Sequence, residues 1–148
     1  MKFRKMTGLD LESVLNVEQN AYAHPWTEGH FKDCLSGNYE SWLLESEGNI
    51  MGHGIISAAV GEAHLLNICV AKAYQRQGLG RIILRYLLDR SRELGASIIF
   101  LEVRESNLSA LALYQSEGYE QIGLRKNYYP SAAGREHAIV MSLQLIPV

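Results

Sequence analysis

A loop of glycine and arginine residues is the first pattern in this sequence that could do chemistry. Residues 75–81 read Q-R-Q-G-L-G-R and stand between an apolar segment and an amphipathic one. Gly78 and Gly80 let the backbone approach a ligand closely, and a helix that begins here offers free N–H groups and the positive end of its dipole. Arg76 and Arg81 could pair with phosphate oxygens. The loop therefore predicts a local anion site, with a plain glycine-containing turn and solvated arginines as the alternative.

The common nucleotide signatures do not describe this loop. The sequence contains no G-x-x-x-x-G-K-[ST] motif, and Ile83 stands where a dinucleotide fingerprint would have its third glycine. The pattern thus argues against ATP and NAD as ligands.

The elements around the loop follow from residue periodicity and from cap residues. Leu79, Ile82, Ile83 and Leu87 share one helical stripe, which Gly95 ends. The same reasoning predicts, in chain order, a strand over 2–5, a helix behind Thr7, a short helix after Thr27, strands over 40–45, 50–59 and 64–70, the helix from 79, a strand over 97–103, a helix capped by Ser106 or Asn107 that ends at Gly118, and strands over 119–128 and 136–145. The segment 97–103 is apolar enough for burial on both faces. This order is typical of an α/β fold with a mixed central sheet flanked by helices, and we expect one domain over residues 1–148.

Composition narrows the functional classes. The chain has 148 residues, of which 47% are hydrophobic and 20% charged, as in a soluble globular protein. Its 14 Lys and Arg against 16 Asp and Glu give a net charge of -2, so no global positive field would hold a nucleic acid or an anionic membrane, and neither is expected as a partner. With no signal peptide and no apolar run long enough to span a membrane, we expect a cytoplasmic protein.

Neither the cysteines nor the histidines form a recognisable disulfide or metal pattern. Cys34 and Cys69 are far apart, and the five histidines show no H-x-x-x-H spacing. The sequence therefore predicts no metal site. Cys69 stands inside an apolar strand, where a cysteine is usually inert, so we expect no covalent acyl-enzyme on its sulfur.

Several sequence blocks together resemble one family. A Gln-x-x-Gly-x-Gly loop that follows a strand and opens a helix resembles the acetyl-coenzyme A pyrophosphate loop of the GCN5-related N-acetyltransferases (GNAT), and the predicted order of elements agrees with that fold. Further blocks are similar to the bacterial RimI-type ribosomal-protein alanine N-acetyltransferases: A-H-P-W-T-E at 23–28, the loop at 74–80, L-E-V-R at 101–104, Asn107 with A-L-Y at 112–114, R-K-N-Y-Y-P at 125–130 and G-R-E at 134–136. His137 departs from this pattern, in which an acidic residue follows the Arg-Glu pair. The resemblance covers nearly the whole chain.

The resemblance implies transfer of an acetyl group from acetyl-coenzyme A (acetyl-CoA) to an amine, and Glu102 is the candidate base. An α-amino group is largely protonated at neutral pH, and only the free amine attacks a thioester. Glu102 lies at the end of the predicted apolar strand 97–103, where a carboxylate can face a cleft while partly desolvated, and the family has its proton acceptor at this position. A solvated strand-end charge, or a pair with Arg104, is the alternative.

Tyr114 is the candidate acid that protonates the coenzyme A thiolate as it leaves. It lies seven residues after Asn107 on the predicted helix, so two helical turns put both side chains on roughly the same face. The family has its proton donor at this position, whereas a helical tyrosine is more often part of the core. Asn107 would hydrogen-bond the cofactor, cap the helix, or do both.

The resemblance also assigns contacts with acetyl-CoA. In the family, the strand before the loop separates from its neighbour, so that its free backbone groups bind the acetyl and pantetheine portions and one N–H stabilises the oxyanion. The predicted cofactor-binding residues are Ile68, Cys69, Val70, Arg76, Gln77, Gly78, Leu79, Gly80, Arg81 and Asn107.

Aromatic residues on expected loops indicate where a peptide would lie. Trp26 and the turn at 128–130 either flank a peptide groove or pack in the core. If they flank the groove, Glu136 or Asp33 could counter a basic residue near the peptide start.

These patterns together predict an enzyme that acetylates a protein amino terminus. The resemblance implies direct transfer, in a ternary complex, to the amino-terminal alanine of ribosomal small-subunit protein eighteen. A GNAT that acetylates lysine side chains or a small amine is the alternative within the fold. A non-catalytic acyl-CoA sensor or interaction module is the alternative of another class, and the joint presence of Glu102 and Tyr114 argues against it. The sequence predicts no oligomeric state.

Overall fold

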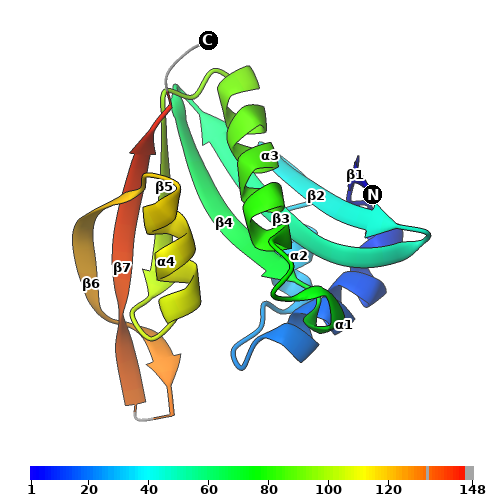
Figure 1. Ribbon diagram of the computed structural model, residues 1–148, viewed down its shortest axis with the longest axis horizontal. Coiled ribbons are helices and arrows are strands. Elements are labelled where there is room, and N and C mark those ends of the chain that lie inside the picture. The colour runs from blue at the N-terminus through cyan, green and yellow to red at the C-terminus, as the bar shows by residue number, and fades with distance from the viewer. Residues whose placement is uncertain (133, 146–148) are drawn as a thin grey trace.

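Seven strands form one sheet, in the order β1-β2-β3-β4-β5-β7-β6, in the computed structural model, which describes residues 1–132 and 134–145. The strands are β1 (Lys2–Lys5), β2 (Tyr39–Ser46), β3 (Asn49–Ala59), β4 (Glu62–Val70), β5 (Ile98–Arg104), β6 (Glu120–Ser131) and β7 (Gly134–Gln144). Neighbouring strands run antiparallel except β4 and β5, which run parallel (Figure 1). The predicted mixed sheet is confirmed.

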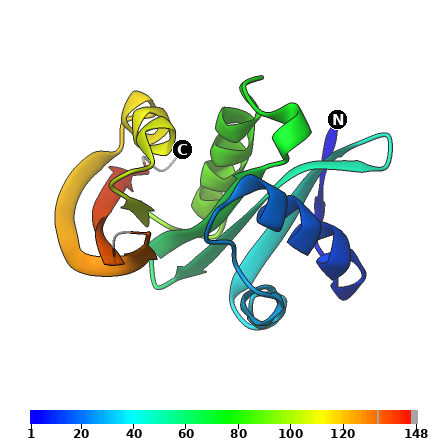
Figure 2. The same cartoon turned by 90° about the horizontal axis from the view of Figure 1, so that it is seen from below.

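Helices cover both faces of this sheet. They are α1 (Leu11–Ala21), α2 (Glu28–Asp33), α3 (Leu79–Glu93) and α4 (Leu108–Ser116), with 3-10 turns at Gly8–Asp10 and Lys72–Tyr74. Figure 2 shows α1 and α2 on one face and α3 and α4 on the other, each pair above its own hydrophobic core. None of the helices within the described residues is long and apolar enough to cross a membrane.

Two predicted caps begin the helices of the first face. The Thr7 side chain accepts a hydrogen bond from the Leu9 N–H, while Asp10 reaches back to the Thr7 N–H. This box opens the short 3-10 turn that leads into α1, rather than α1 itself. Thr27 caps α2 in the same way, with His30 as its reciprocal partner. Such reciprocal bonds satisfy backbone N–H groups that the first turn leaves free.

The two parallel strands pair only at their beginnings. The register runs from Glu62 opposite Ile98 to Leu65 opposite Leu101 and then stops. Leu66 has no partner on β3, because the β3–β4 register shifts at this point. A bulge of this kind bends the strand that contains it. In Figure 1, β4 and β5 accordingly lie together near one end and separate toward the other.

The expectation that residues 97–103 are buried on both faces is wrong for one face. Ile99, Leu101 and Val103 are buried in the core beneath α3 and α4, but the residues between them are only partly buried. The helices of the opposite face pack instead over β2, β3 and β4. On that side of β5, Phe100 stacks on the His64 ring of β4 with centroids 5.4 Å apart.

Candidate active site

The predicted anion loop has the backbone shape that such a site requires. Arg76 and Gly78 have φ angles of 65° and 78°, in the left-handed region. A side chain at Gly78 would meet nothing within 4 Å, so glycine serves the backbone conformation there and not a tight space. Helix α3 begins at Leu79 with no side-chain cap. Its first N–H groups and the positive end of its dipole are thus available to an anion, as the pyrophosphate of a coenzyme would need.

The two arginines of the loop differ in their surroundings. Arg76 is exposed and takes part in none of the ion pairs found in the described part of the chain. Arg81 instead pairs with Glu117 at the end of α4, with 2.8 Å between Nη1 and Oε2, and Arg85 holds the other oxygen of the same carboxylate at 2.6 Å. Hydrogen bonds from Arg85 and Arg81 hold the pKa of Glu117 below its usual range. A phosphate contact by Arg81 would compete with Glu117, and the phosphate role of both arginines stays a prediction.

Where β4 and β5 separate, beyond Leu65 and Leu101, an opening lies between them in the sheet. The last residues of β4 present backbone groups to this opening. The Tyr22 hydroxyl donates a hydrogen bond to the Ile68 carbonyl, and Gln75 Nε2 donates to the Val70 carbonyl at 3.1 Å. The N–H and C=O groups of one residue in an antiparallel strand point to the same side, so the N–H groups of Ile68 and Val70 point into the opening as well. Cys69, between them, points its backbone to β3, where it stands opposite His53. The predicted strand edge is therefore available at Ile68 and Val70.

Glu102 is the first residue of β5 beyond the last pair with β4. Its Oε1 lies 3.1 Å from Nε of Arg125 on β6, and its side chain is 27% exposed. Arg104, the alternative partner considered from sequence, donates to the Pro130 carbonyl at 2.6 Å and lies 3.9 Å from Glu136. Glu102 is thus neither fully solvated nor paired with Arg104, and it borders the opening.

Tyr114 projects from α4 and is buried, with 5% of its surface exposed. Burial raises the pKa of its phenol above the usual range, and the neighbouring Tyr129 adds to the rise. Burial and then the Glu102 carboxylate raise the pKa of Tyr129 to about 12. A phenol that keeps its proton at neutral pH can act as a proton donor.

The opening in the sheet joins residues from its two faces. Tyr22 follows α1 on one face, and Tyr114 belongs to α4 on the other. Burial raises the pKa of Tyr22 above its usual range, and Cys69, Glu18 and Tyr114 contribute further. Tyr22 thus reaches the edge of β4 from one face of the sheet, while Tyr114 is buried in the core of the other face. No local sequence signal identifies Tyr22, because its contact with Ile68 spans 46 residues.

Asn107 caps α4, as one of its two predicted roles requires. Its Oδ1 accepts hydrogen bonds from the Ala110 N–H and the Ser109 hydroxyl, each at 3.2 Å. Ser106, the other candidate cap, donates instead to Glu136 at 2.8 Å. The contact of Asn107 with the coenzyme stays a prediction.

The residues expected near a peptide groove divide between core and surface. Trp26 packs on Phe31 with ring centroids 5.2 Å apart, whereas Tyr128 is 44% exposed. Glu136 is held by Arg104 and Ser106, as described above, and Asp33 is exposed on α2. His137, which departs from the subfamily pattern, accepts a hydrogen bond at Nδ1 from the Asn127 N–H at 3.0 Å. It thereby fixes the irregular part of β6, where Asn127 has a φ of 52°.

A buried polar cluster lies behind the end of β4 and was not predicted. It contains Glu18 of α1, His53 of β3, and Asn67 and Cys69 of β4. Burial raises the pKa of the Cys69 thiol and of the Glu18 carboxyl, and it lowers the pKa of His53 to about 4. A buried, protonated thiol is a poor nucleophile, which agrees with the expectation that Cys69 forms no acyl-enzyme.

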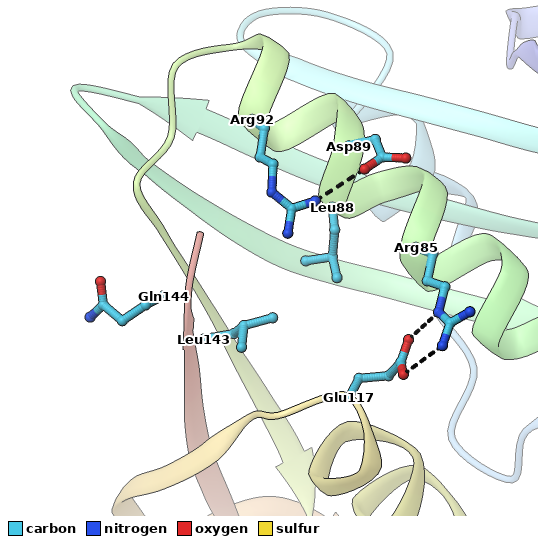
Figure 3. Close-up of a pocket in the computed structure, with 7 residues that line it drawn as sticks. All are labelled: Arg85, Leu88, Asp89, Arg92, Glu117, Leu143 and Gln144. Carbon is cyan, nitrogen blue, oxygen red and sulfur yellow. Dashed lines mark hydrogen bonds and ion pairs between the residues drawn. The ribbon is translucent and has the colours of Figure 1, made fainter. Parts of the chain in front are cut away.

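A hollow between α3, α4 and β7 contains none of the predicted catalytic residues (Figure 3). It is lined by Arg85, Leu88, Asp89, Arg92, Glu117, Leu143 and Gln144. Its charged groups pair with one another, Arg85 with Glu117 and Arg92 with Asp89. We therefore locate the candidate active site at the opening between β4 and β5 and not in this hollow.

Comparison with known proteins agrees with this geometry. Residues 11–119 match the Acetyltransferase (GNAT) family. The chain belongs to this family. The GNAT fold and the acetyltransferase class expected from the sequence are thus confirmed, and the loop before α3 and the separation of β4 from β5 are the features that the resemblance implied.

Individual GNAT relatives resemble the chain over nearly its whole length. The [ribosomal protein bS18]-alanine N-acetyltransferase of Escherichia coli K12 is 41% identical over 136 residues, which are 92% of each chain. The crystal structure of the ribosomal-protein-S18-alanine N-acetyltransferase from Escherichia coli superposes with a TM-score of 0.92 at 39% identity, covering 97% of this chain and 93% of that one. Arabidopsis thaliana NAA60 in complex with acetyl-CoA shares the fold, with a TM-score of 0.85 at 13% identity over 97% and 98% of the two chains.

Proposed function

We propose that this protein transfers an acetyl group from acetyl-CoA to the α-amino group of the amino-terminal alanine of ribosomal small-subunit protein bS18. The observation that carries the proposal is the likeness, at 41% identity over 92% of both chains, to an Escherichia coli enzyme named for that reaction. The position of Glu102 at the point where β5 separates from β4, next to the unpaired edge of β4, supports acyl transfer as the chemistry.

The coenzyme would follow the path from the loop to the opening. The N–H groups at the start of α3, with Gly78 and Gly80 behind them, are suited to bind its pyrophosphate. The N–H groups of Ile68 and Val70 are suited to bind the pantetheine arm and the acetyl carbonyl, as an added strand would bind a sheet edge. Gln75 and Tyr22 already satisfy the carbonyls of these two residues, which leaves N–H donors for the ligand.

The chemical step needs one base, one acid and one hydrogen-bond donor. Glu102 accepts a proton from the substrate ammonium, directly or through water, and the free amine then forms a bond with the acetyl carbon. An N–H of the β4 edge stabilises the negative charge on the acetyl oxygen. As the carbon–sulfur bond breaks, the Tyr114 phenol donates its proton to the coenzyme A thiolate. The attacking nitrogen loses its second proton to solvent as the amide forms, and solvent returns one proton to the Tyr114 oxygen.

The pKa of the substrate amine favours an α-amino group over a lysine side chain. An α-amino group has an ordinary pKa of about 7.7–8.0, against about 10.4 for lysine. Removal of its proton by a carboxylate at neutral pH therefore costs less by between two and three units of pKa. A lysine acetyltransferase with this site would work against the larger difference.

Thiol release from acetyl-CoA with two matched peptides tests the proposal. One peptide carries the free amino terminus of the ribosomal protein, and the other has the same sequence with a blocked terminus and an internal lysine. We expect turnover confined to the free terminus. Turnover on the lysine peptide would keep the acetyltransferase and reject this substrate, and silence with both peptides would favour a small amine or the acyl-CoA sensor.

A further inference from the structure

The buried cluster behind β4 brings together three metal-ligating side chains from three elements. One donor atom each from Glu18 of α1, His53 of β3 and Cys69 of β4 lies within 4.8 Å of the other two. The three residues are 1%, 0% and 1% exposed. Oε1 of Glu18 and Nε2 of His53 are 3.6 Å apart, too far for a hydrogen bond but suitable for two ligands of one small cation.

Unsatisfied polar atoms in the same place indicate a ligand. Within residues 1–132 and 134–145, both ring nitrogens of His53 and Oδ1 of Asn67 are buried without a hydrogen-bond partner. Most buried polar groups in proteins find a partner, and an imidazole with two idle nitrogens in a core is costly. Asn67 donates its amide N–H to Oε1 of Glu18 at 3.2 Å, so it lies at the cluster and orients the carboxylate.

We propose that Glu18, His53 and Cys69 bind one divalent transition-metal ion of the zinc class. A set of one sulfur, one nitrogen and one oxygen suits zinc or cobalt, whereas magnesium and calcium require oxygen ligands alone. A buried water molecule beside the three protein ligands would complete the tetrahedral shell that zinc takes. The site is separate from the proposed acetyl transfer and does not depend on it.

Charge balance supports this donor set. On binding, the Cys69 thiol loses its proton to solvent as the sulfur–metal bond forms, because a coordinated cation deprotonates a thiol outright. One thiolate and one carboxylate then neutralise the charge of a divalent cation, and His53 ligates through a neutral nitrogen. No electrons are transferred. A centre with zero net charge suits a buried position far better than a lone ion would.

The position of the site predicts a structural role beside the active site. The metal would join α1 to β3 and β4 just below the strand edge formed by Ile68 and Val70. It would also hold the end of α1, from which Tyr22 reaches the Ile68 carbonyl. No sequence motif marks this site, because its ligands are far apart in the chain and meet only in the folded sheet.

Cobalt titration of the full chain tests the proposal, because cobalt reports on its own ligands. The protein is stripped with a chelator, kept reduced with a phosphine, and titrated with Co²⁺. We expect one equivalent to bind, a thiolate-to-cobalt charge-transfer band to appear in the near ultraviolet, and one equivalent of Zn²⁺ to displace it. Cys69→Ala should lose the band, while Cys34→Ala, at the other buried cysteine, should retain it.

Two measurements keep the test decisive if Cys69→Ala does not fold. His53→Gln should weaken Zn²⁺ binding by at least about tenfold. Calorimetry of Zn²⁺ binding to the unaltered protein in two buffers of different ionisation enthalpy should show release of at least one proton per metal, because both the Cys69 thiol and the Glu18 carboxyl ligate in their deprotonated forms. A wild-type protein that shows no thiolate band, a band that persists in Cys69→Ala, or binding without proton release would overturn the proposal.

Discussion

Leu65 of β4 stands opposite Leu101 of β5, and the register between the two strands ends at this pair. The next residue of β5 is Glu102, so the proposed base occupies the first position after the strands separate. On β4, the bulge at Leu66 follows immediately. The place where the sheet opens and the place of the carboxylate are therefore fixed by the same pair of leucines.

Replacement of Glu102 by glutamine should remove the base and leave the coenzyme site intact. We expect Glu102→Gln to lower kcat/KM at neutral pH by about 10²–10⁴-fold, the usual contribution of general acid–base catalysis. Coenzyme A binding, measured by calorimetry, should stay within about twofold because the loop and the β4 edge are unchanged. The exposed Glu120, at the start of β6, supplies the control variant Glu120→Gln. Unchanged turnover in Glu102→Gln would exclude this residue from the mechanism.

Replacing Tyr114 or Tyr119 by phenylalanine should distinguish the proposed proton donor, Tyr114, from the neighbouring buried tyrosine, Tyr119. Tyr114 and Tyr119 pack with ring centroids 5.5 Å apart, and both are buried. We expect Tyr114→Phe to lower kcat by about 10²-fold with little change in thermal stability. Tyr119→Phe is the matched control, because the Tyr119 hydroxyl has no hydrogen-bond partner in the described part of the chain and its loss should leave the rate unchanged. Equal effects of the two variants would remove the special role of Tyr114.

The raised pKa of Tyr114 also predicts the alkaline side of the pH–rate profile. Burial favours the neutral phenol, so the proton is retained to a higher pH than in an ordinary tyrosine. Turnover of the wild-type enzyme, followed by thiol release, should therefore show no decline from this group up to pH ~10, the usual tyrosine value. A decline that begins well below that pH and disappears in Tyr114→Phe would contradict the assignment.

Gly8 and Gly52, neither of which has a positive φ angle, should respond differently to replacement by alanine. A Cβ at Gly52 of β3 would lie 2.6 Å from the Cys69 carbonyl oxygen and 2.7 Å from Cδ1 of Ile83, whereas one at Gly8 would meet nothing within 4 Å. We expect Gly52→Ala to reduce the free energy of unfolding by about 2 kcal/mol, since β3, β4 and α3 would have to move apart. Gly8→Ala should change it by less than about 0.5 kcal/mol. Urea unfolding of both variants measures this difference, and equal losses would show that the close approach is not the cause.

An ion pair between β2 and α3 predicts part of the acid sensitivity of the fold. Arg90 donates from Nε and Nη2 to the two carboxylate oxygens of Glu40 at 2.8 and 2.6 Å, and Trp42 Nε1 donates at 2.9 Å. The bonds from Arg90, more than that from Trp42, hold the pKa of Glu40 below its ordinary value of 4.5. Because the folded state holds the carboxylate ionised, this stabilisation is present above pH 4.5 and is lost as the pH falls through the lowered pKa.

Glu40→Gln should make that dependence visible. We expect the variant to unfold about 1 kcal/mol more easily at pH 7, with the difference from wild type shrinking steadily below pH ~4.5. Thermal unfolding followed by circular dichroism at a series of pH values measures the difference. Two stability curves that stay parallel from pH 7 to pH 3 would show that Glu40 does not contribute in this way.

Local patterns in the sequence determined the order of elements and much of the loop. Thr7 and Thr27 predict helical starts because a cap bonds to N–H groups only two or three residues away. The apolar stripe from Leu79 to Leu87 depends only on helical spacing. The same holds for the loop at 75–81, whose glycines and following helix are neighbours in the chain. Interactions of such short range can be predicted from the order of residues alone.

Only the tertiary structure decided which distant residues meet at the opening. The partner of Glu102 is Arg125 and not the nearby Arg104, Tyr22 reaches the carbonyl of Ile68, and Glu18 and Cys69 share one buried point. Each contact depends on how many residues of β4 pair with β5 before the bulge bends β4 away. A bulge disrupts ladder hydrogen bonds, and contacts made elsewhere in the fold offset the free energy that this costs. Because those contacts join residues far apart in the chain, no local sequence pattern predicts the bulge.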